Sequence, residues 1–105
     1  MIPDPQRVRE VETAIQGVEA LFAEGRVRSA RDWHSMASLI GNIVYAATDA
    51  FGKNGMLLRM RRPVTRLLEA AQRAKVSRTV VEQTGLAWIP EEAAQLRRKP
   101  PGDTD

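Results

Sequence analysis

The sequence predicts an all-α protein, folded as a compact bundle of four to six helices joined by short loops. Apolar residues recur every three or four positions along several stretches, which is the spacing of one helix face. Serine, proline and glycine stand at the ends of these stretches, where helices start and stop. No stretch alternates apolar and polar residues for long enough to indicate a strand. At 105 residues we expect one domain over residues 1–99 and a disordered tail over 100–105.

The first predicted helix covers residues 6–24, with Pro5 before it and Gly25 at its end. Its apolar residues form one stripe, the apolar stripe 8–22: Val8, Val11, Ile15, Val18 and Phe22. Such a stripe packs either inside its own domain or against a second copy of the chain. It is shorter than three heptads, which favours packing inside one domain. The five residues remain the candidate protein interface, through which a dimer would form.

A second helix is predicted from Ser29 to residue 51. Ser29 and Asp32 resemble a capping box, with aspartate in place of the usual glutamate. Trp33, Ile40 and Val44 fall on one face of this helix. Gly52 is expected to close it, and residues 53–55 (Lys-Asn-Gly) to form a turn.

The remaining stretches predict shorter or interrupted helices. Pro63 lies inside the apolar pattern of residues 56–75, so this stretch is either a kinked helix or two helices that meet near Arg62. A short helix follows from Ser77 to about Thr84. A last helix is expected from Pro90, because proline and the acids after it suit a first turn.

The residues that carry ordinary catalysis are nearly absent from the sequence. It has no cysteine and a single histidine, His34, which has no acid or second imidazole at helical spacing. There is no glycine-rich phosphate loop and no Gly-x-Ser-x-Gly motif. We therefore expect a protein that is not an enzyme, with no catalytic residue, metal site or cofactor.

The hydropathy pattern gives an expectation about location. The N-terminal residues lack the features of a signal peptide, and the longest apolar-leaning stretch, 39–47, is too short to span a bilayer. A cytoplasmic protein is expected.

Positive charge is concentrated in the middle of the chain. The net charge is +3, but residues 53–78 carry +7 while the segments on either side carry −2 each. Arginine dominates this segment, and its planar guanidinium binds phosphate or carboxylate through two parallel hydrogen bonds, so nucleic acid, a membrane surface or an acidic protein could be the partner. The candidate nucleic-acid-binding residues are Arg59, Arg62, Arg66, Arg73, Lys75 and Arg78.

Part of this segment resembles the helix-turn-helix of bacterial repressors. Residues 71–81 read AQRAKVSRTVV, with Ala71 at the helix contact, Val76 in the turn and Ser77 at the start of the second helix. The resemblance implies a helix-turn-helix-like hairpin near residues 68–85, with Arg78, Thr79 and Glu82 facing DNA. Lys75 departs from the pattern, because the turn usually has glycine there.

Together these features predict a small non-catalytic binding protein that contacts the phosphate backbone of nucleic acid through residues 53–78. The alternative is a protein–protein interaction module: an adaptor, an inhibitor, or a subunit of a phage-type or ribonucleoprotein assembly. Trp33 and Trp88 are its candidate anchors, and the apolar stripe 8–22 its route to a homo-oligomer. Membrane binding ranks lowest, because Pro63 interrupts the amphipathic stretch.

Overall fold

The computed structural model describes residues 4–98, which contain four α-helices and no strand. The helices are α1 (Pro5–Ala23), α2 (Ala30–Arg73), α3 (Arg78–Gln83) and α4 (Trp88–Arg98). The all-α fold class is confirmed. The predicted tail, residues 100–105, lies outside the described residues.

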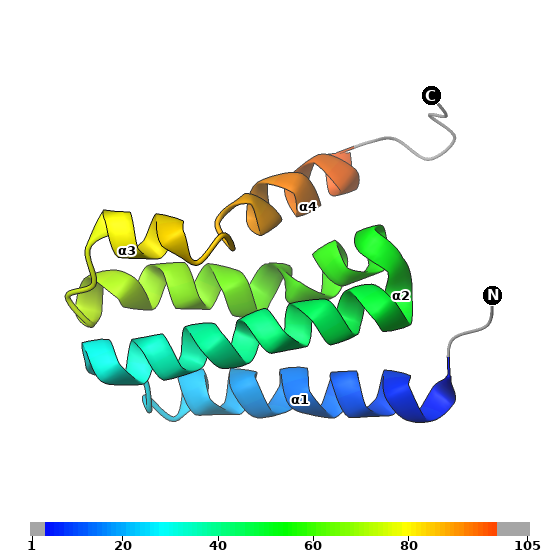
Figure 1. Ribbon diagram of the computed structural model, residues 1–105, viewed down its shortest axis with the longest axis horizontal. Coiled ribbons are helices and arrows are strands. Elements are labelled where there is room, and N and C mark those ends of the chain that lie inside the picture. The colour runs from blue at the N-terminus through cyan, green and yellow to red at the C-terminus, as the bar shows by residue number, and fades with distance from the viewer. Residues whose placement is uncertain (1–3, 99–105) are drawn as a thin grey trace.

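Helix α1 lies along one side of α2 (Figure 1). It begins at a cap that the sequence analysis missed: the Asp4 carboxylate accepts a hydrogen bond from the Gln6 N–H at 3.0 Å. Its apolar stripe 8–22 faces α2, with the central valines Val11 and Val18 buried and the other three residues half-buried against the same core. The stripe therefore packs inside the chain.

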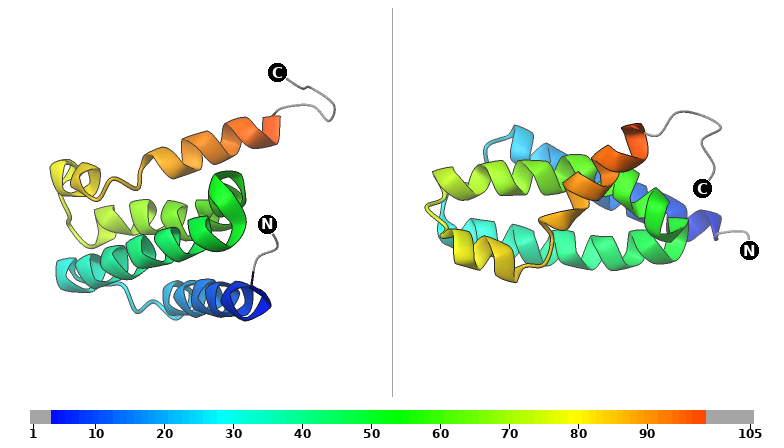
Figure 2. Two further views of the ribbon diagram at one scale, coloured as in Figure 1. Left: turned by 45° about the vertical axis from the view of Figure 1, so that its right-hand side comes forward. Right: turned by 90° about the horizontal axis from the view of Figure 1, so that it is seen from above.

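Helix α2 is bent at Gly52 into two arms that run antiparallel, side by side (Figures 1 and 2). We call residues 30–51 the first arm and residues 53–73 the second arm. Gly52 has φ 78° and ψ 174°, a conformation that essentially only glycine adopts. The expected turn at residues 53–55 is wrong, because the chain reverses at Gly52 alone and is helical again from the next residue.

Pro63 does not divide the second arm. The helix runs through it with helical backbone angles, and the proline ring is buried. The alternative of two helices meeting near Arg62 is therefore wrong. Proline has no N–H to donate to the Arg59 carbonyl one turn earlier, and burial of its apolar ring offsets part of that loss.

The core lies between the two arms and the helices on either side of them. Trp33 of the first arm is fully buried, and its indole N–H donates to the Leu67 carbonyl of the second arm at 2.8 Å. Around it pack aliphatic side chains from both arms, among them Ile40, Met60 and Leu67. Because it is buried, Trp33 is not a surface anchor, and that part of the interface hypothesis is wrong.

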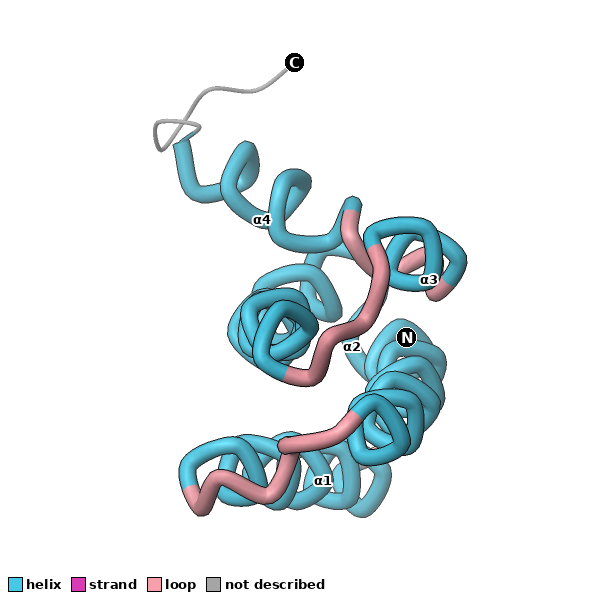
Figure 3. The backbone as a smooth tube through the Cα atoms, turned by 90° about the vertical axis from the view of Figure 1, so that its left-hand side faces the viewer, coloured by secondary structure: helices cyan, strands magenta, loops and turns pink. Residues whose placement is uncertain are grey.

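The C-terminal helices cover the face of α2 opposite α1, so the molecule has three layers (Figure 3). Lys75 takes φ 58° in the turn after the second arm, and Ser77 caps α3 by accepting from the Val80 N–H at 3.3 Å. A helix end, a turn and a second helix thus follow one another, but α3 has only six residues and none of them is buried. Helix α4 begins at Trp88, two residues before the predicted start at Pro90.

Candidate nucleic-acid interface

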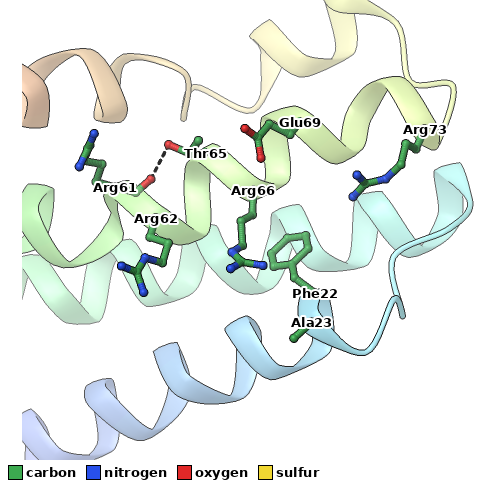
Figure 4. A pocket seen from close by; sticks show the side chains of 8 residues that line it. All are labelled: Phe22, Ala23, Arg61, Arg62, Thr65, Arg66, Glu69 and Arg73. Carbon is green, nitrogen blue, oxygen red and sulfur yellow. Dashed lines mark hydrogen bonds between the residues drawn. The ribbon is translucent and has the colours of Figure 1, made fainter.

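A groove with a volume of about 650 Å³ runs between α1 and the second arm of α2. We call it the arginine groove, because four of its eight lining residues are arginines (Figure 4). The lining residues are Phe22, Ala23, Arg61, Arg62, Thr65, Arg66, Glu69 and Arg73.

Helical spacing places three of these arginines on one face of the second arm. Arg62, Arg66 and Arg73 are separated by four and seven residues, so they lie above one another along the helix. At 1.5 Å per residue the row is about 17 Å long. In Figure 4, Arg62 and Arg66 point from the second arm toward α1, whereas Arg61 points away from it.

Positive charge in the groove is only partly neutralised. Arg62 lies 3.7 Å from the Glu19 carboxylate of α1, an ion pair in which the arginine side chain is still 75% exposed. Among the described residues, Arg61, Arg66 and Arg73 form no salt bridge within 4.0 Å. Glu69 is the single acid in the lining. The groove therefore presents guanidinium groups with free donors to an anion.

Arg59 extends the row toward the bend. It lines a smaller hollow of about 230 Å³ beside Arg61 and Arg62. Its guanidinium carbon lies 3.8 Å from the centre of the Phe51 ring, and one of its nitrogens donates to the Gly55 carbonyl at 3.4 Å. Stacking on an aromatic ring holds the guanidinium plane in place. With Arg59 included, the row is about 21 Å long.

The other two predicted binding residues do not join this row. Lys75 is in the turn after the second arm, and Arg78 begins α3, where its Nε lies 3.2 Å from the Glu82 carboxylate. Neither residue lines the arginine groove. The structure therefore brings together Arg59, Arg62, Arg66 and Arg73.

Two residues of the site were not singled out from the sequence. Arg61 was counted in the basic segment, but its helical position differs from that of the other arginines. Phe22 was assigned to the apolar stripe 8–22; it packs against the core and also lines the groove. The placement of both depends on how α1 lies against the second arm, which no sequence pattern gives.

A second groove, of about 740 Å³, lies between the first arm and the segment that joins α3 to α4. Two aromatic side chains line it and are exposed to solvent, Tyr45 at 81% and Trp88 at 40%. The Lys53 ammonium lies 5.9 Å from the centre of the Trp88 ring. This apolar groove and the arginine groove lie on different sides of α2.

The residues that the structure describes form no cluster of three or more histidine, aspartate or glutamate side chains able to hold a metal ion. His34 is exposed and meets the edge of the Trp33 ring, with the ring centres 5.7 Å apart. Over residues 4–98, no helix is both long enough and apolar enough to cross a membrane.

Comparison with known proteins adds no assignment to this geometry. No protein-family model, curated protein sequence or solved structure matches the chain.

Proposed function

We propose that the protein binds nucleic acid by holding its phosphate backbone in the arginine groove. The observation that carries the proposal is the row of Arg62, Arg66 and Arg73 along one groove whose lining contains a single acid.

Phosphate is the anion that this arrangement suits best. A guanidinium binds a phosphate through two parallel hydrogen bonds, and a row of them suits an anion that repeats along a line. Phosphates follow one another along a nucleic-acid strand, so a row about 17 Å long can meet more than one of them. A single carboxylate ligand would engage one or two of the four arginines.

The groove supports this function better than the helix-turn-helix hypothesis does. The second helix of that motif must present several side chains to bases. Here α3 ends after six residues, and its single arginine, Arg78, is paired with Glu82.

The test is fluorescence anisotropy with labelled DNA and RNA at two salt concentrations. We compare the double variant Arg66→Gln/Arg73→Gln with Arg7→Gln/Arg31→Gln, which removes the same charge outside the groove. Loss of two phosphate contacts is expected to weaken binding at low salt at least tenfold, on the order of 1.4 kcal/mol or more. The negative slope of log K against log salt should become shallower by about 1.5.

The control double variant is expected to bind like the wild-type chain. Equal weakening in both double variants would show that net charge acts without the groove. Absence of binding by the wild-type chain at low salt would overturn the proposal.

A second candidate function, protein–protein interaction, is favoured by the exposed Tyr45 and Trp88 in the apolar groove. Aromatic side chains are enriched at interface hot spots. If the chain self-associates, we expect this groove to be the interface, because the apolar stripe 8–22 already packs against α2. Sedimentation equilibrium of the wild-type chain and of Tyr45→Ser tests this. A dimer that survives Tyr45→Ser and Trp88→Ser would place the interface elsewhere.

A further inference from the structure

We infer that the arginine groove binds a single unpaired strand of nucleic acid in preference to a duplex. The inference rests on the proposed nucleic-acid function and specifies the class of ligand.

The shape of the arginine groove favours a single strand. A helix that reads the bases of a duplex lies in the major groove, which is about 12 Å wide and admits one helix of about 10–12 Å diameter. The arginine row of the second arm faces α1, which lies alongside it (Figure 4). The second arm therefore cannot enter a major groove with this face first, because α1 occupies the adjoining space. A flexible single strand can follow the recess between the two helices.

The positive surface is also narrow. The basic row is one helix face wide, and the α1 side of it is acidic. Glu19 lines the small hollow beside Arg62, and Glu12 lines another beside Arg59. A duplex lying over the row brings its second phosphate backbone toward these carboxylates, where like charges repel. A single strand has one phosphate backbone, which can lie along the arginine row, and it brings no second backbone toward these carboxylates.

An aromatic ring lies among the guanidinium groups of the groove. Phe22 lines the groove together with Arg66 and Arg73 and is half-buried, so part of its ring is accessible. Unpaired bases stack on aromatic rings and on guanidinium planes, whereas paired bases are already stacked inside the duplex. The groove thus offers both components of a single-strand site, a basic track for the backbone and surfaces for bases.

The experiment compares oligonucleotides of one sequence as single-stranded RNA, single-stranded DNA and duplex DNA, using the full chain in low salt. Both single strands are expected to bind at least about tenfold tighter than the duplex. This comparison requires no variant. Equal or tighter duplex binding would overturn the inference and leave the proposed function standing. Failure of all three oligonucleotides to bind would overturn the proposed function itself.

Variants of Phe22 test the stacking contact. Phe22→Leu keeps an apolar side chain against the core and removes the ring, so single-strand affinity should fall by about 5- to 100-fold. Duplex affinity should not change. Phe22→Tyr keeps the ring and should bind single strands like the wild-type chain. If Phe22→Leu, shown by circular dichroism to be folded, binds single strands at full affinity, the ring has no part in binding.

Discussion

Arg62 is the arginine of the groove that already has an acidic partner. Its ion pair with Glu19 is long, at 3.7 Å, and the Glu19 side chain is 28% exposed. Surface ion pairs contribute about 0–1 kcal/mol, and water still screens the Arg62 side chain, which is 75% exposed. A phosphate oxygen brings a second negative charge to the same guanidinium. Glu19 is therefore expected to compete with the ligand for Arg62.

Replacement of Glu19 tests this competition. We expect Glu19→Gln to tighten single-strand binding by about twofold to fivefold, the equivalent of a weak surface ion pair. Glu92→Gln is the matched control: it also raises the net charge by one, but it breaks the 3.9 Å pair between Glu92 and Lys53, away from the groove. Fluorescence anisotropy titrations of a labelled single strand with each variant measure the two affinities. Equal gains would show that net charge, not release of Arg62, changes the affinity.

The two tryptophans differ in what they contribute to stability. Trp33 is fully buried and bonded to Leu67, so Trp33→Phe loses a buried hydrogen bond and some packing volume. We expect the free energy of unfolding to fall by about 1–3 kcal/mol. Trp88→Phe, at a position 40% exposed, should change it by less than about 0.5 kcal/mol. Urea unfolding followed by circular dichroism measures both changes, and similar values would contradict the assignment of Trp33 to the core.

At this scale the sequence predicted part of the site. The spacing of Arg59, Arg62, Arg66 and Arg73 places them on one face of any straight helix, so their grouping followed from periodicity alone. Phe22 could not be assigned to the groove in this way. Its role depends on which helix lies next to the second arm, and that depends on packing between distant segments.

The bend of α2 into two arms depends on a single backbone position, Gly52. Gly52 has φ 78° and ψ 174°, so Gly52→Ala should lower the free energy of unfolding by about 1–3 kcal/mol. Gly41→Ala is the control: a Cβ there meets nothing within 4 Å, and alanine in a helix should add about 0.5–1 kcal/mol. Urea unfolding of both variants tests the contrast. A neutral Gly52→Ala would show that the bend tolerates an ordinary side chain.

The N-terminus of α2 predicts a dependence of stability on pH. The Arg28 and Ser29 N–H groups both donate to the Asp32 carboxylate at 3.2 Å, and these hydrogen bonds, the one from Arg28 first, lower the pKa of Asp32 below its ordinary 3.8. Since the folded-state pKa is the lower one, this contribution is complete above pH 3.8 and is lost as the pH falls through the folded-state value. Asp32→Asn removes the titration.

We therefore expect wild type to be more stable than Asp32→Asn at neutral pH, with the difference shrinking below pH 3.8. Thermal unfolding of the two chains along a series of acidic buffers provides the comparison. A stability difference that stays constant over the whole series would mean that Asp32 acts by packing and not through its charge.

Helix boundaries were predicted best where a side chain makes the cap. Ser29 and Ser77 cap α2 and α3, as their local sequences indicate. The expected turn at residues 53–55 and one of the two alternatives at Pro63, a break between two helices, fail for one reason: local rules treat glycine, asparagine and proline as helix breakers. Here the bend needs only Gly52, and Pro63 is held in the helix by its buried surroundings.

In the whole molecule, the acidic and basic parts of the chain lie side by side. Helix α1 carries Glu12 and Glu19 toward the basic second arm, and the Glu19–Arg62 pair joins the two. Segment charges predicted that the middle of the chain is basic. They could not show that Glu12 and Glu19 of α1 line one side of the basic row, because that depends on the order of the layers. The proposed preference for a single strand rests on this arrangement.

The continuity of the second arm ties the binding surface to the folding of the protein. Met60, Val64 and Leu67 face the core from the same uninterrupted helix that turns Arg62 and Arg66 toward α1. Inserting or deleting one residue between them would rotate everything beyond it by about 100°, taking apolar side chains out of the core and arginines out of the groove together. An insertion or deletion that turned the arginines away from the groove would therefore also destabilise the fold. Substitution of an arginine changes the charge of the groove and leaves the helix register unchanged.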